Sequence, residues 1–437
     1  MSLQFISHSK KQFSGEITVA GDKSISHRAV MLAAIAEGTS TIEHFLNGYD
    51  CLATLKAFQQ MGVKVNFTSA TTLVIQGVGK HGLKPPEETI NCGNSGTSIR
   101  LISGLLAGQK FNSELTGDAS LQKRPMRRIL QPLRRMGANI SAKEDNYPPL
   151  QIHKVANLQA IDYRLPVASA QVKSALLLAG LYANGETVIH EPKPTRDHTE
   201  LMLESFAVDL HKQGDKIALI GENQTLKATE IYVPGDISSA AFFIVATLIT
   251  SGSELVIKNV GINPTRTGII KILRLMGAHI DISNQRHFNR ELVADLLIKS
   301  SELHGVEIPR ELIPAAIDEF PIIFVAAANA QGTTRLQGAD ELRVKESDRI
   351  AAMAQGLRTN GIQLEETSDG ITIQGGELTG GEVNSYHDHR IAMAFSIAGL
   401  IAKTPIVIND CDNVATSFPN FITLAKQLSL PIEEKKL

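Results

Sequence analysis

Alanine-rich apolar stretches of helical length recur six times along the chain, each after a polar turn and before glycine and a β-branched run. The first stretch lies within Gly21–Ile42 and the fourth within Gly235–Ile257, and these two match closely. The other four begin near Asn94, Ser169, Ile317 and His387. Such self-similarity at a steady spacing predicts a fold built from one repeated supersecondary unit.

A second, amphipathic helix alternates with the first and is followed by a strand. It is predicted over 55–65, 130–140, 201–210, 269–280 and 353–364, with a weaker copy over 421–432. Glycine closes four of these helices, at Gly62, Gly137, Gly277 and Gly361, whereas the third copy has Ala207 there. Glycine at this place indicates a left-handed C-terminal cap. The repeat therefore spans about 70 to 85 residues and contains two helices and several short strands.

Two similar tetrads divide the chain into halves. Val-Ala-Gly-Asp occupies 19–22 and Val-Pro-Gly-Asp occupies 233–236, directly before the first and fourth apolar helices. Three units fit between the tetrads and three follow the second. We therefore expect an α/β protein of two domains joined near these glycines, which would let the halves close like a hinge.

The polar residues of the repeat gather at the predicted helix starts. Unpaired N–H groups and the positive end of the helix dipole make such positions attractive to anions. About nine cationic side chains of these motifs could converge: Lys23, Arg28, Arg100, Arg124, Lys173, Arg196, Lys345, Arg349 and Arg390. Capping requires neither Arg nor Lys, so the pattern predicts a substrate, or a pair of substrates, with several negative charges. The fourth helix start is the exception, because it has Asp236 and serines but neither Lys nor Arg.

Each motif of the first half also has a purely structural interpretation. Over 21–28, Ser24 or Ser26 would cap a helix, or the segment would be an anion receptor. The glycine-rich stretch 91–98 would bring backbone close to a ligand, but it lacks the spacing of a Walker motif. The basic loop 117–128 is also what a solvated turn looks like, and Pro125 suits a first helical turn. Thr195–Glu200 is compatible with a capping box.

The second half has charged motifs with alternatives of the same kind. Asp318 and Glu319 interrupt an apolar segment, where carboxylates must be paired, exposed or functional, and partial burial would suit one of them to general-base work. Over 343–349 we predict that Lys345 and Arg349 share a helical face and that Glu346 reaches Arg349, which would also describe a surface ion-pair ladder.

Two histidines and an aspartate at 387–389 raise the possibility of zinc. The i, i+2 spacing of the histidines, without a Cys or HExxH partner, argues against it, and we expect neither metal nor cofactor. Cys51, Cys92 and Cys411 are too far apart for a metal-ligand spacing.

Composition narrows the class of protein. The chain has 437 residues, a formal net charge of −2 and no tryptophan, so nothing favours nucleic acid as a partner. No apolar run reaches the roughly 18 residues of a membrane span, and the first residues lack a signal-peptide core. We expect a cytoplasmic, monomeric enzyme that acts on small molecules.

Taken together, the segments GDKSISHRA, GNSGTS, GDASLQKRPM, SAQVKSA, RVKESDR and HDHRIAMA resemble the EPSP synthase (3-phosphoshikimate 1-carboxyvinyltransferase) family over about Val19–Phe418. SAQVKSALLLAG with TRDHTE looks like that family's second bacterial class. The resemblance implies two domains of three βαβαββ units around buried helices, an inverse α/β barrel. It divides the chain into 21–234 and 1–20 plus 235–437, with the active site in the cleft.

The resemblance also implies the reaction and the roles of residues. Shikimate 3-phosphate and phosphoenolpyruvate would give 5-enolpyruvylshikimate 3-phosphate and phosphate through a tetrahedral adduct. Asp318 would take the proton of the 5-hydroxyl, and Glu346 with Lys23 would handle proton transfer on phosphoenolpyruvate. The residues implied to bind phosphoenolpyruvate are Lys23, Gly96, Arg124, Gln171, Arg349 and Arg390. Those implied to bind shikimate 3-phosphate are Lys23, Ser24, Arg28, Ser169, Gln171, Arg196, Asp318 and Lys345.

Two residues depart from the pattern of the family, and two alternative functions remain open. Thr416 stands where many members have a Lys that touches phosphoenolpyruvate, and Gly96 stands where some glyphosate-tolerant members have Ala, so glyphosate sensitivity stays open. UDP-N-acetylglucosamine 1-carboxyvinyltransferases share the fold but have a catalytic Cys in the loop that here contains Ala119. A non-catalytic repeat scaffold that binds acidic peptides would need neither Asp318 nor Glu346.

Overall fold

The computed structural model describes residues 3–436, which divide into two compact units. Unit 1 comprises Pro234–His287 and the described parts of Met1–Ala20 and Leu292–Leu437. Unit 2 comprises Gly21–Val233 and Phe288–Glu291. Both units mix helices and strands, so the predicted α/β class is confirmed.

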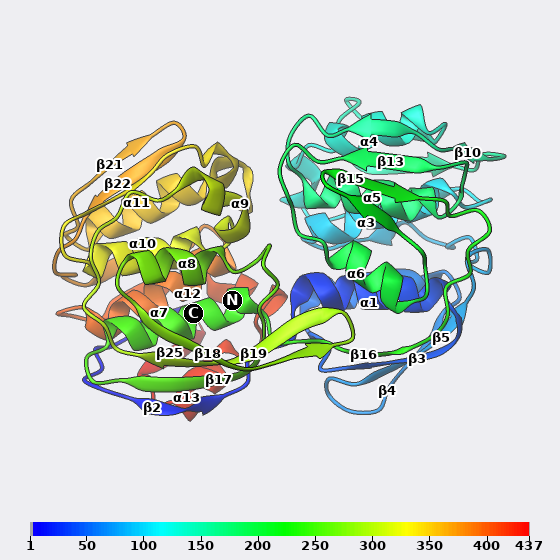
Figure 1. Cartoon of the computed structure of the whole chain (residues 1–437). Coiled ribbons are helices and arrows are strands. Elements are labelled where there is room, and N and C mark those ends of the chain that lie inside the picture. The colour runs from blue at the N-terminus through cyan, green and yellow to red at the C-terminus, as the bar shows by residue number, and fades with distance from the viewer. Residues whose placement is uncertain (1–2, 437) are drawn as a thin grey trace. The chain divides into compact units, whose positions relative to one another are not determined.

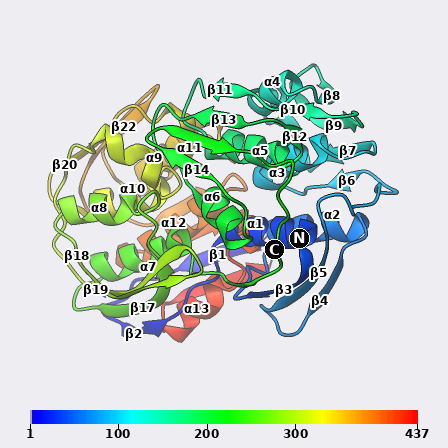
Figure 2. The ribbon, with the colours of Figure 1, turned by 45° about the vertical axis from the view of Figure 1, so that its right-hand side comes forward.

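Unit 2 contains three copies of the repeat. Its inner helices are α1 (Lys23–Ile35), α3 (Gly96–Ala107) and α5 (Ala170–Gly180), and its outer helices are α2 (Tyr49–Gln60), α4 (Arg127–Arg135) and α6 (His198–Ser205). Its strands are β3 (Glu37–Glu43), β4 (Lys64–Phe67), β5 (Leu73–Val78), β6 (Ile90–Asn91), β7 (Ser113–Thr116), β8 (Asn139–Lys143), β9 (Tyr147–His153), β10 (Leu158–Gln159), β11 (Asp162–Arg164), β12 (Ala183–Asn184), β13 (Thr187–His190), β14 (His211–Gln213), β15 (Lys216–Leu219) and β16 (Glu230–Tyr232), with a 3-10 turn η1 (Leu121–Lys123). Figure 2 shows β3, β4 and β5 beside α1 and α2.

Unit 1 contains the other three copies. Its inner helices are α7 (Ile237–Ile249), α10 (Phe320–Asn329) and α12 (His389–Ala398), and the others are α8 (Gly268–Leu275), α9 (Ile313–Ala316), α11 (Arg349–Thr359) and α13 (Phe421–Gln427). Its strands are β1 (Leu3–Ser7), β2 (Ser14–Ile17), β17 (Glu254–Gly261), β18 (His279–Phe288), β19 (Glu291–Lys299), β20 (Thr333–Leu336), β21 (Leu364–Thr367), β22 (Gly370–Gln374), β23 (Gly381–Asn384), β24 (Ile406–Asn409) and β25 (Ile432–Lys436). The 3-10 turns are η2 (Arg310–Leu312), η3 (Asp340–Val344), η4 (Gly399–Ile401) and η5 (Cys411–Thr416). β18 and β19 form a hairpin whose tip, Phe288–Glu291, belongs to unit 2.

Most of the sheets follow one plan. The first strand in the sheet order pairs in parallel with the second. The second pairs antiparallel with the third, and the third and fourth form an antiparallel pair, as in the orders β16-β3-β5-β4 and β6-β7-β9-β8. The N-terminal segment supplies two strands to the sheets of unit 1. β2 leads the fourth copy by pairing in parallel with β17, and β1 lies between β24 and β25. The first residues therefore complete the sheets of the second half of the chain.

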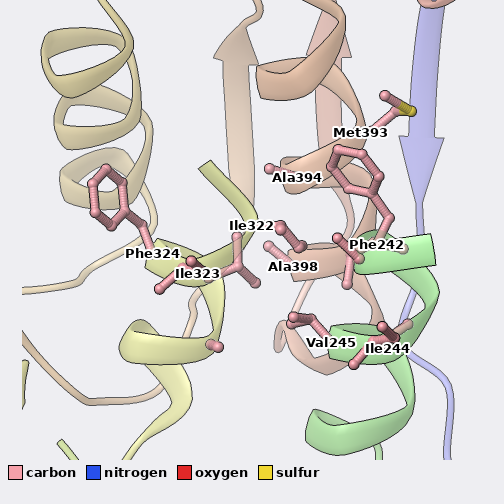
Figure 3. Close-up of a cluster of buried hydrophobic side chains, with 14 of the residues drawn as sticks. Phe242, Ile244, Val245, Ile322, Ile323, Phe324, Met393, Ala394 and Ala398 are labelled. Atoms are coloured by element: carbon pink, nitrogen blue, oxygen red, sulfur yellow. The ribbon is translucent and has the colours of Figure 1, made fainter. Parts of the chain in front are cut away.

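The inner helices form the core of each unit because most of their residues are buried. All 13 residues of α7 are buried, and α7, α10 and α12 contact one another. Figure 1 shows these three helices inside unit 1, and Figure 3 shows Phe242, Ile323 and Met393 in the cluster between them. Each fully buried side chain of this size stabilises the unit by about 1.5–3 kcal/mol. Among residues 3–436, no helix is both long and apolar enough to span a bilayer.

The outer helices end in the predicted left-handed conformation. Gly62, Gly137, Gly277 and Gly361 have φ between +83° and +96°. Ala207 takes the same place in the third copy with a φ of +62°, and Ser429 takes it in the sixth with +53°. The backbone of the repeat therefore requires this conformation even where the residue has a Cβ, which costs about 1–2 kcal/mol.

Candidate active site

The start of α1 carries the first cationic group of unit 2. Asp22 caps the helix by accepting a 2.9 Å hydrogen bond from the N–H of Ile25, so the prediction that Ser24 or Ser26 is the cap was wrong. A carboxylate is the stronger partner here because it also faces the positive end of the helix. Lys23 begins the helix and forms an ion pair with Asp50 of α2. The predicted catalytic ammonium group is therefore oriented by a carboxylate from the neighbouring helix.

Arg28 lies one turn further along α1, in a buried cage of neutral oxygens. Its Nε donates to Oγ1 of Thr199 at 2.7 Å, Nη1 to the carbonyl of Ser24 at 2.9 Å, and Nη2 to Oγ of Ser174 at 2.8 Å. Burial lowers the pKa of Arg28 to about 10, although the charge of Glu200 partly offsets the effect. A buried cation whose hydrogen bonds, among residues 3–436, go to these neutral oxygens favours an anionic ligand nearby.

A second cationic group surrounds the start of α3. Nη1 of Arg100 donates to Oε1 of Gln171 at 2.5 Å, and Nη2 of Arg124 donates to Oδ1 of Asn94 at 2.7 Å. A Cβ on Gly96 would lie 3.1 Å from Nη1 of Arg100 and 3.4 Å from Nη1 of Arg124. Glycine at this place therefore lets two guanidinium groups lie against a helix N-terminus, a combination that suits an anion.

Two details of this group differ from expectation. Pro125 lies between η1 and α4, and α4 begins only at Arg127, so Pro125 is not in a first helical turn. Its carbonyl instead accepts from Nη2 of Arg100 at 3.4 Å. Arg100 thus joins the loop to α3, a role that its position within an apolar helix did not reveal.

Lys173 does not belong with the cations available to a ligand. Its side chain has 0% exposure, and Nζ lies 2.6 Å from Oε1 of Glu200 and 3.0 Å from Oε2 of Glu191. Including it among the cations that meet a substrate was wrong, because two buried carboxylates already surround it. The capping box was also wrong, since Asp197 makes no side-chain cap bond and Glu200 turns to Lys173.

The remaining predicted residues of unit 2 lie at the other helix starts. Ser169 caps α5, its hydroxyl accepting from the N–H of Val172 at 3.4 Å. Gln171 follows in the first turn and also donates to Oγ1 of Thr97 at 3.1 Å. Arg196 precedes α6, close enough to Arg28 for its charge to lower the pKa of Arg28 further.

In unit 1, Arg349 is the centre of a cluster of carboxylates. Its side chain is 1% exposed; Nε donates to Oδ2 of Asp388 at 2.9 Å, Nη2 to Oε2 of Glu346 at 2.5 Å, and Nη1 to Oδ1 of Asp318 at 3.4 Å. Burial alone would lower the pKa of Arg349, but the three carboxylates raise it above its ordinary range. The guanidinium is therefore a permanent charge that holds Asp318 and Glu346 on one centre.

The segment before α11 corrects one prediction and confirms another. Lys345 lies after η3 and outside α11, so it does not share a helical face with Arg349. The contact between Glu346 and Arg349 is confirmed, but burial of Arg349 excludes the surface ladder. Nζ of Lys345 lies 3.9 Å from Oδ1 of Asp318, so two cations flank that carboxylate and favour its ionised form.

Asp388 and Arg390 stand at the start of α12. Asp388 caps the helix by accepting from the N–H of Arg390 at 2.9 Å, and it also pairs with Arg349. Nη1 of Arg390 donates to the carbonyl of Asp318 at 2.9 Å. Residues 3–436 hold no group of three or more His, Cys, Asp or Glu placed to bind a metal ion. Thr416, at the end of η5, donates its hydroxyl to the carbonyl of Asn413 at 2.6 Å.

Sequence reasoning missed several partners of the predicted residues. Asp50 was not singled out because it lies in a helix with no motif of its own. Asp388 was considered only as a zinc ligand. Its pairing with Arg349 requires contact between two copies of the repeat, which the sequence of one copy does not show. Their common feature is that each is a carboxylate that orients a cation from another part of the repeat.

Comparison with known proteins agrees with this arrangement. The family model described as EPSP synthase (3-phosphoshikimate 1-carboxyvinyltransferase) matches residues 8–424. The chain is 57% identical over 432 residues to a 3-phosphoshikimate 1-carboxyvinyltransferase of Legionella pneumophila strain Corby, covering 99% of each chain. It is also 57% identical over 419 residues to the protein of that name from Methylococcus capsulatus, covering 96% of each.

Solved structures extend the likeness to three dimensions. A structure of EPSP synthase from Acinetobacter baumannii superposes with a TM-score of 0.90 at 52% identity and covers 100% of both chains. The enolpyruvyl transferase NikO from Streptomyces tendae superposes with a TM-score of 0.82 at 16% identity, covering 100% of this chain and 99% of the other. At that identity the second likeness shows the fold alone.

Proposed function

The chain belongs to the EPSP synthase family, and from that premise we propose that it transfers the enolpyruvyl group of phosphoenolpyruvate to the 5-hydroxyl of shikimate 3-phosphate. The products are 5-enolpyruvylshikimate 3-phosphate and inorganic phosphate. The reaction needs a proton donor, a proton acceptor and cations around two phosphorylated substrates. Both units carry such cations at their helix starts.

The observation that carries the proposal is the cluster around Arg349. One buried guanidinium binds both Asp318 and Glu346. Two carboxylates held on one rigid centre are suited to act as a base and an acid in one reaction, because neither can move independently of the other. A purely anion-binding scaffold would gain nothing from carboxylates beside its cations.

The proton transfers assign a role to each carboxylate. Glu346 donates a proton to the methylene carbon of phosphoenolpyruvate, which makes the neighbouring carbon electrophilic. Asp318 accepts the proton of the 5-hydroxyl as its oxygen bonds to that carbon, giving a tetrahedral adduct. Glu346, left as a carboxylate by the first step, then takes a proton back from the new methyl group as the double bond forms again and the C–O bond to phosphate breaks. Lys23 assists at the bridging oxygen of the departing phosphate.

The binding roles come from the resemblance to the family, and the cations at the helix starts support them. We assign phosphoenolpyruvate to the residues that the resemblance implies for it: Lys23, Gly96, Arg124, Gln171, Arg349 and Arg390. We assign shikimate 3-phosphate to the residues that the resemblance implies for it: Lys23, Ser24, Arg28, Ser169, Gln171, Arg196, Asp318 and Lys345. Both groups draw residues from both units, so we propose that each chain completes its own active site and works as a monomer.

The first experiment measures phosphate release by the purified protein. Release should require both shikimate 3-phosphate and phosphoenolpyruvate, and either substrate alone should give none. Release from phosphoenolpyruvate with UDP-N-acetylglucosamine as the acceptor would assign the chain to the rival carboxyvinyltransferase activity. No release with either acceptor would contradict an enzymatic function.

A second experiment tests the base. Asp318→Asn keeps the size of the side chain but cannot accept the hydroxyl proton, so turnover should fall by about 10²–10⁴-fold. The matched control is Asp340→Asn, because Asp340 is exposed on η3, in the same charged region. Turnover of Asp318→Asn within a factor of two of the control would remove Asp318 from the role of base.

A further inference from the structure

The start of α7 carries a cation that its sequence does not provide. Arg266, from the loop between β17 and α8, is buried there, and its Nη2 donates to Oδ1 of Asp236 at 3.1 Å and to Oγ of Ser238 at 2.8 Å. Asp236 also caps α7 by accepting from the N–H of Ser238 at 2.8 Å. The fourth copy of the repeat therefore combines a capping carboxylate with a guanidinium, as Asp388 and Arg349 do at α12, and its guanidinium comes from about thirty positions away.

Ser238 connects this group to the proposed active site. Its hydroxyl hydrogen-bonds Oε1 of Glu319, the residue that directly follows Asp318. Glu319 is 1% exposed, and an ionised carboxylate buried so deeply requires hydrogen bonds and a counter-charge. One counter-charge is Arg390, whose Nη1 lies 3.8 Å from Oε1 of Glu319.

Arg390 is held on one edge of its guanidinium. Nη1 faces Oε1 of Glu319 and donates to the carbonyl of Asp318 at 2.9 Å. Within residues 3–436, no protein atom accepts a hydrogen bond from Nε or Nη2 of Arg390. A guanidinium fixed through one nitrogen leaves its remaining donors in a defined direction, which is what two-point recognition of a carboxylate or phosphate requires.

We propose that Glu319 is a positioning residue for Arg390, and that Ser238 and Arg266 hold Glu319 in place. The inference rests on the proposed function, in which Arg390 binds phosphoenolpyruvate. Glu319 touches no substrate; it sets the orientation in which Arg390 meets one. The start of α7 thereby contributes to the proposed active site through the contacts among Arg266, Ser238 and Glu319, although α7 itself has no Lys or Arg at its start.

The test separates positioning from a merely structural role. Glu319→Gln keeps the size of the side chain and an oxygen for Ser238 but removes the charge that faces Arg390. We expect the KM for phosphoenolpyruvate to rise about tenfold, the change that loss of one charge-assisted contact gives. The KM for shikimate 3-phosphate should change less than twofold. Ser238→Ala should shift the KM for phosphoenolpyruvate in the same direction by about threefold, because Glu319 then loses one of its hydrogen bonds.

Ser239→Ala is the matched control. Ser239 follows Ser238 in α7 and is also buried, but it makes none of these contacts. Both KM values of Ser239→Ala should therefore stay within twofold of wild type. If Glu319→Gln does not fold, Ser238→Ala alone decides between the alternatives. An unchanged KM for phosphoenolpyruvate in the folded variants, or equal rises for both substrates, would overturn the positioning role.

The result can be told apart from failure of the proposed function itself. Wild-type protein that releases no phosphate contradicts the function, whatever the variants do. In that case the affinity of wild type and variants for phosphoenolpyruvate is measured by calorimetry with shikimate 3-phosphate present. Weaker binding by Glu319→Gln than by Ser239→Ala would still support the positioning of Arg390, and equal affinities would overturn it.

Discussion

Nδ1 of His198 lies 2.6 Å from Oε1 of Glu291, and both side chains are buried. Glu291 begins β19, at the tip of the β18–β19 hairpin, whose flanking residues belong to unit 1 while the tip itself belongs to unit 2. The tip is also fixed by the ring of Phe288, 4.4 Å from that of Tyr232, and by the hydrogen bonds of Asn289. The tip of the hairpin therefore packs within unit 2, although the residues on either side of it belong to unit 1.

The pair of His198 and Glu291 at the hairpin tip lies beside residues assigned to shikimate 3-phosphate. His198 is the first residue of α6, Arg196 precedes it by two positions, and Thr199 after it accepts a hydrogen bond from Arg28. Glu291→Ala should therefore weaken binding of shikimate 3-phosphate by about 1 kcal/mol, roughly a fivefold rise in KM, with little change for phosphoenolpyruvate. Steady-state kinetics with each substrate varied in turn would measure both values.

The adjacent Arg290 provides the control for Glu291. Nε of Arg290 lies 3.8 Å from Oε2 of Glu204, and both side chains are exposed, so this pair contributes little. Arg290→Ala should leave both KM values unchanged. If Glu291→Ala behaves like Arg290→Ala, the hairpin tip does not act on the binding residues.

The buried triad of Lys173, Glu191 and Glu200 leads to a prediction about stability. Lys173→Met would leave two buried carboxylates without their cation, and burial already raises the pKa of Glu200. Removing one partner of a buried ion pair costs about 3–5 kcal/mol. We expect a lower urea midpoint for Lys173→Met, and recovery of most of the loss when Glu191→Gln and Glu200→Gln are added. Equal stability of Lys173→Met and wild type would show that the triad is not needed for folding.

Lys173 also shows where sequence reasoning stops. A cation at a helix start looks the same in the sequence whether it faces a ligand or a carboxylate of its own unit. The contacts that decide, with Glu191 and Glu200, come from residues with no recognisable pairing signal. Arg266 shows the opposite error, because it reaches α7 from a loop that carries no motif. Long-range charge pairing is set by packing between repeats, which the periodicity of one repeat does not describe.

The backbone of the repeat could be predicted much further than its charges. Periodic apolar positions and the glycines at helix ends give the inner and outer helices, because burial and left-handed caps depend on local sequence. The capping residues were harder to predict than the helices. Asp22 caps α1 in place of a neighbouring serine, and the sequence did not distinguish them because both residue types are good N-caps. The joining of β1 and β2 to the second half follows from no local pattern and entered only through resemblance.

Ala207 offers a test of the repeat's backbone. It has a φ of +62°, and it is exposed at the place where four copies have glycine. Ala207→Gly removes the clash of a Cβ in the left-handed region but gives the unfolded chain more freedom, so we expect a net gain of about 1 kcal/mol. The converse change, Gly137→Ala at the equivalent position, should destabilise the protein. Urea midpoints of both variants would measure the effects, and opposite signs are expected.

The pair of Asp388 and Arg349 predicts a dependence of stability on pH. Burial by itself would raise the pKa of Asp388, but Arg349 beside it more than compensates, so the pKa lies below its ordinary value. Because the folded-state pKa is below the unfolded value of about 3.9, ionised Asp388 stabilises the fold above that pH. This contribution is lost as the pH falls through the folded-state pKa.

Asp388→Asn isolates that contribution from the other carboxylates of the chain. At pH 7 the variant should be less stable than wild type by about 3 kcal/mol, since Arg349 stays buried with one counter-charge fewer. The difference between wild type and variant should then narrow as the pH falls below about 4, because Asp388 of the unfolded chain takes up its proton there, while folded Asp388 keeps its charge until the pH reaches its lower pKa. Urea unfolding of both proteins between pH 7 and pH 3 would measure it. A stability difference that stays constant over this range would mean that the charge of Asp388 does not stabilise the fold. Its contribution would then come only from the geometry of its hydrogen bonds to Arg349 and to the start of α12.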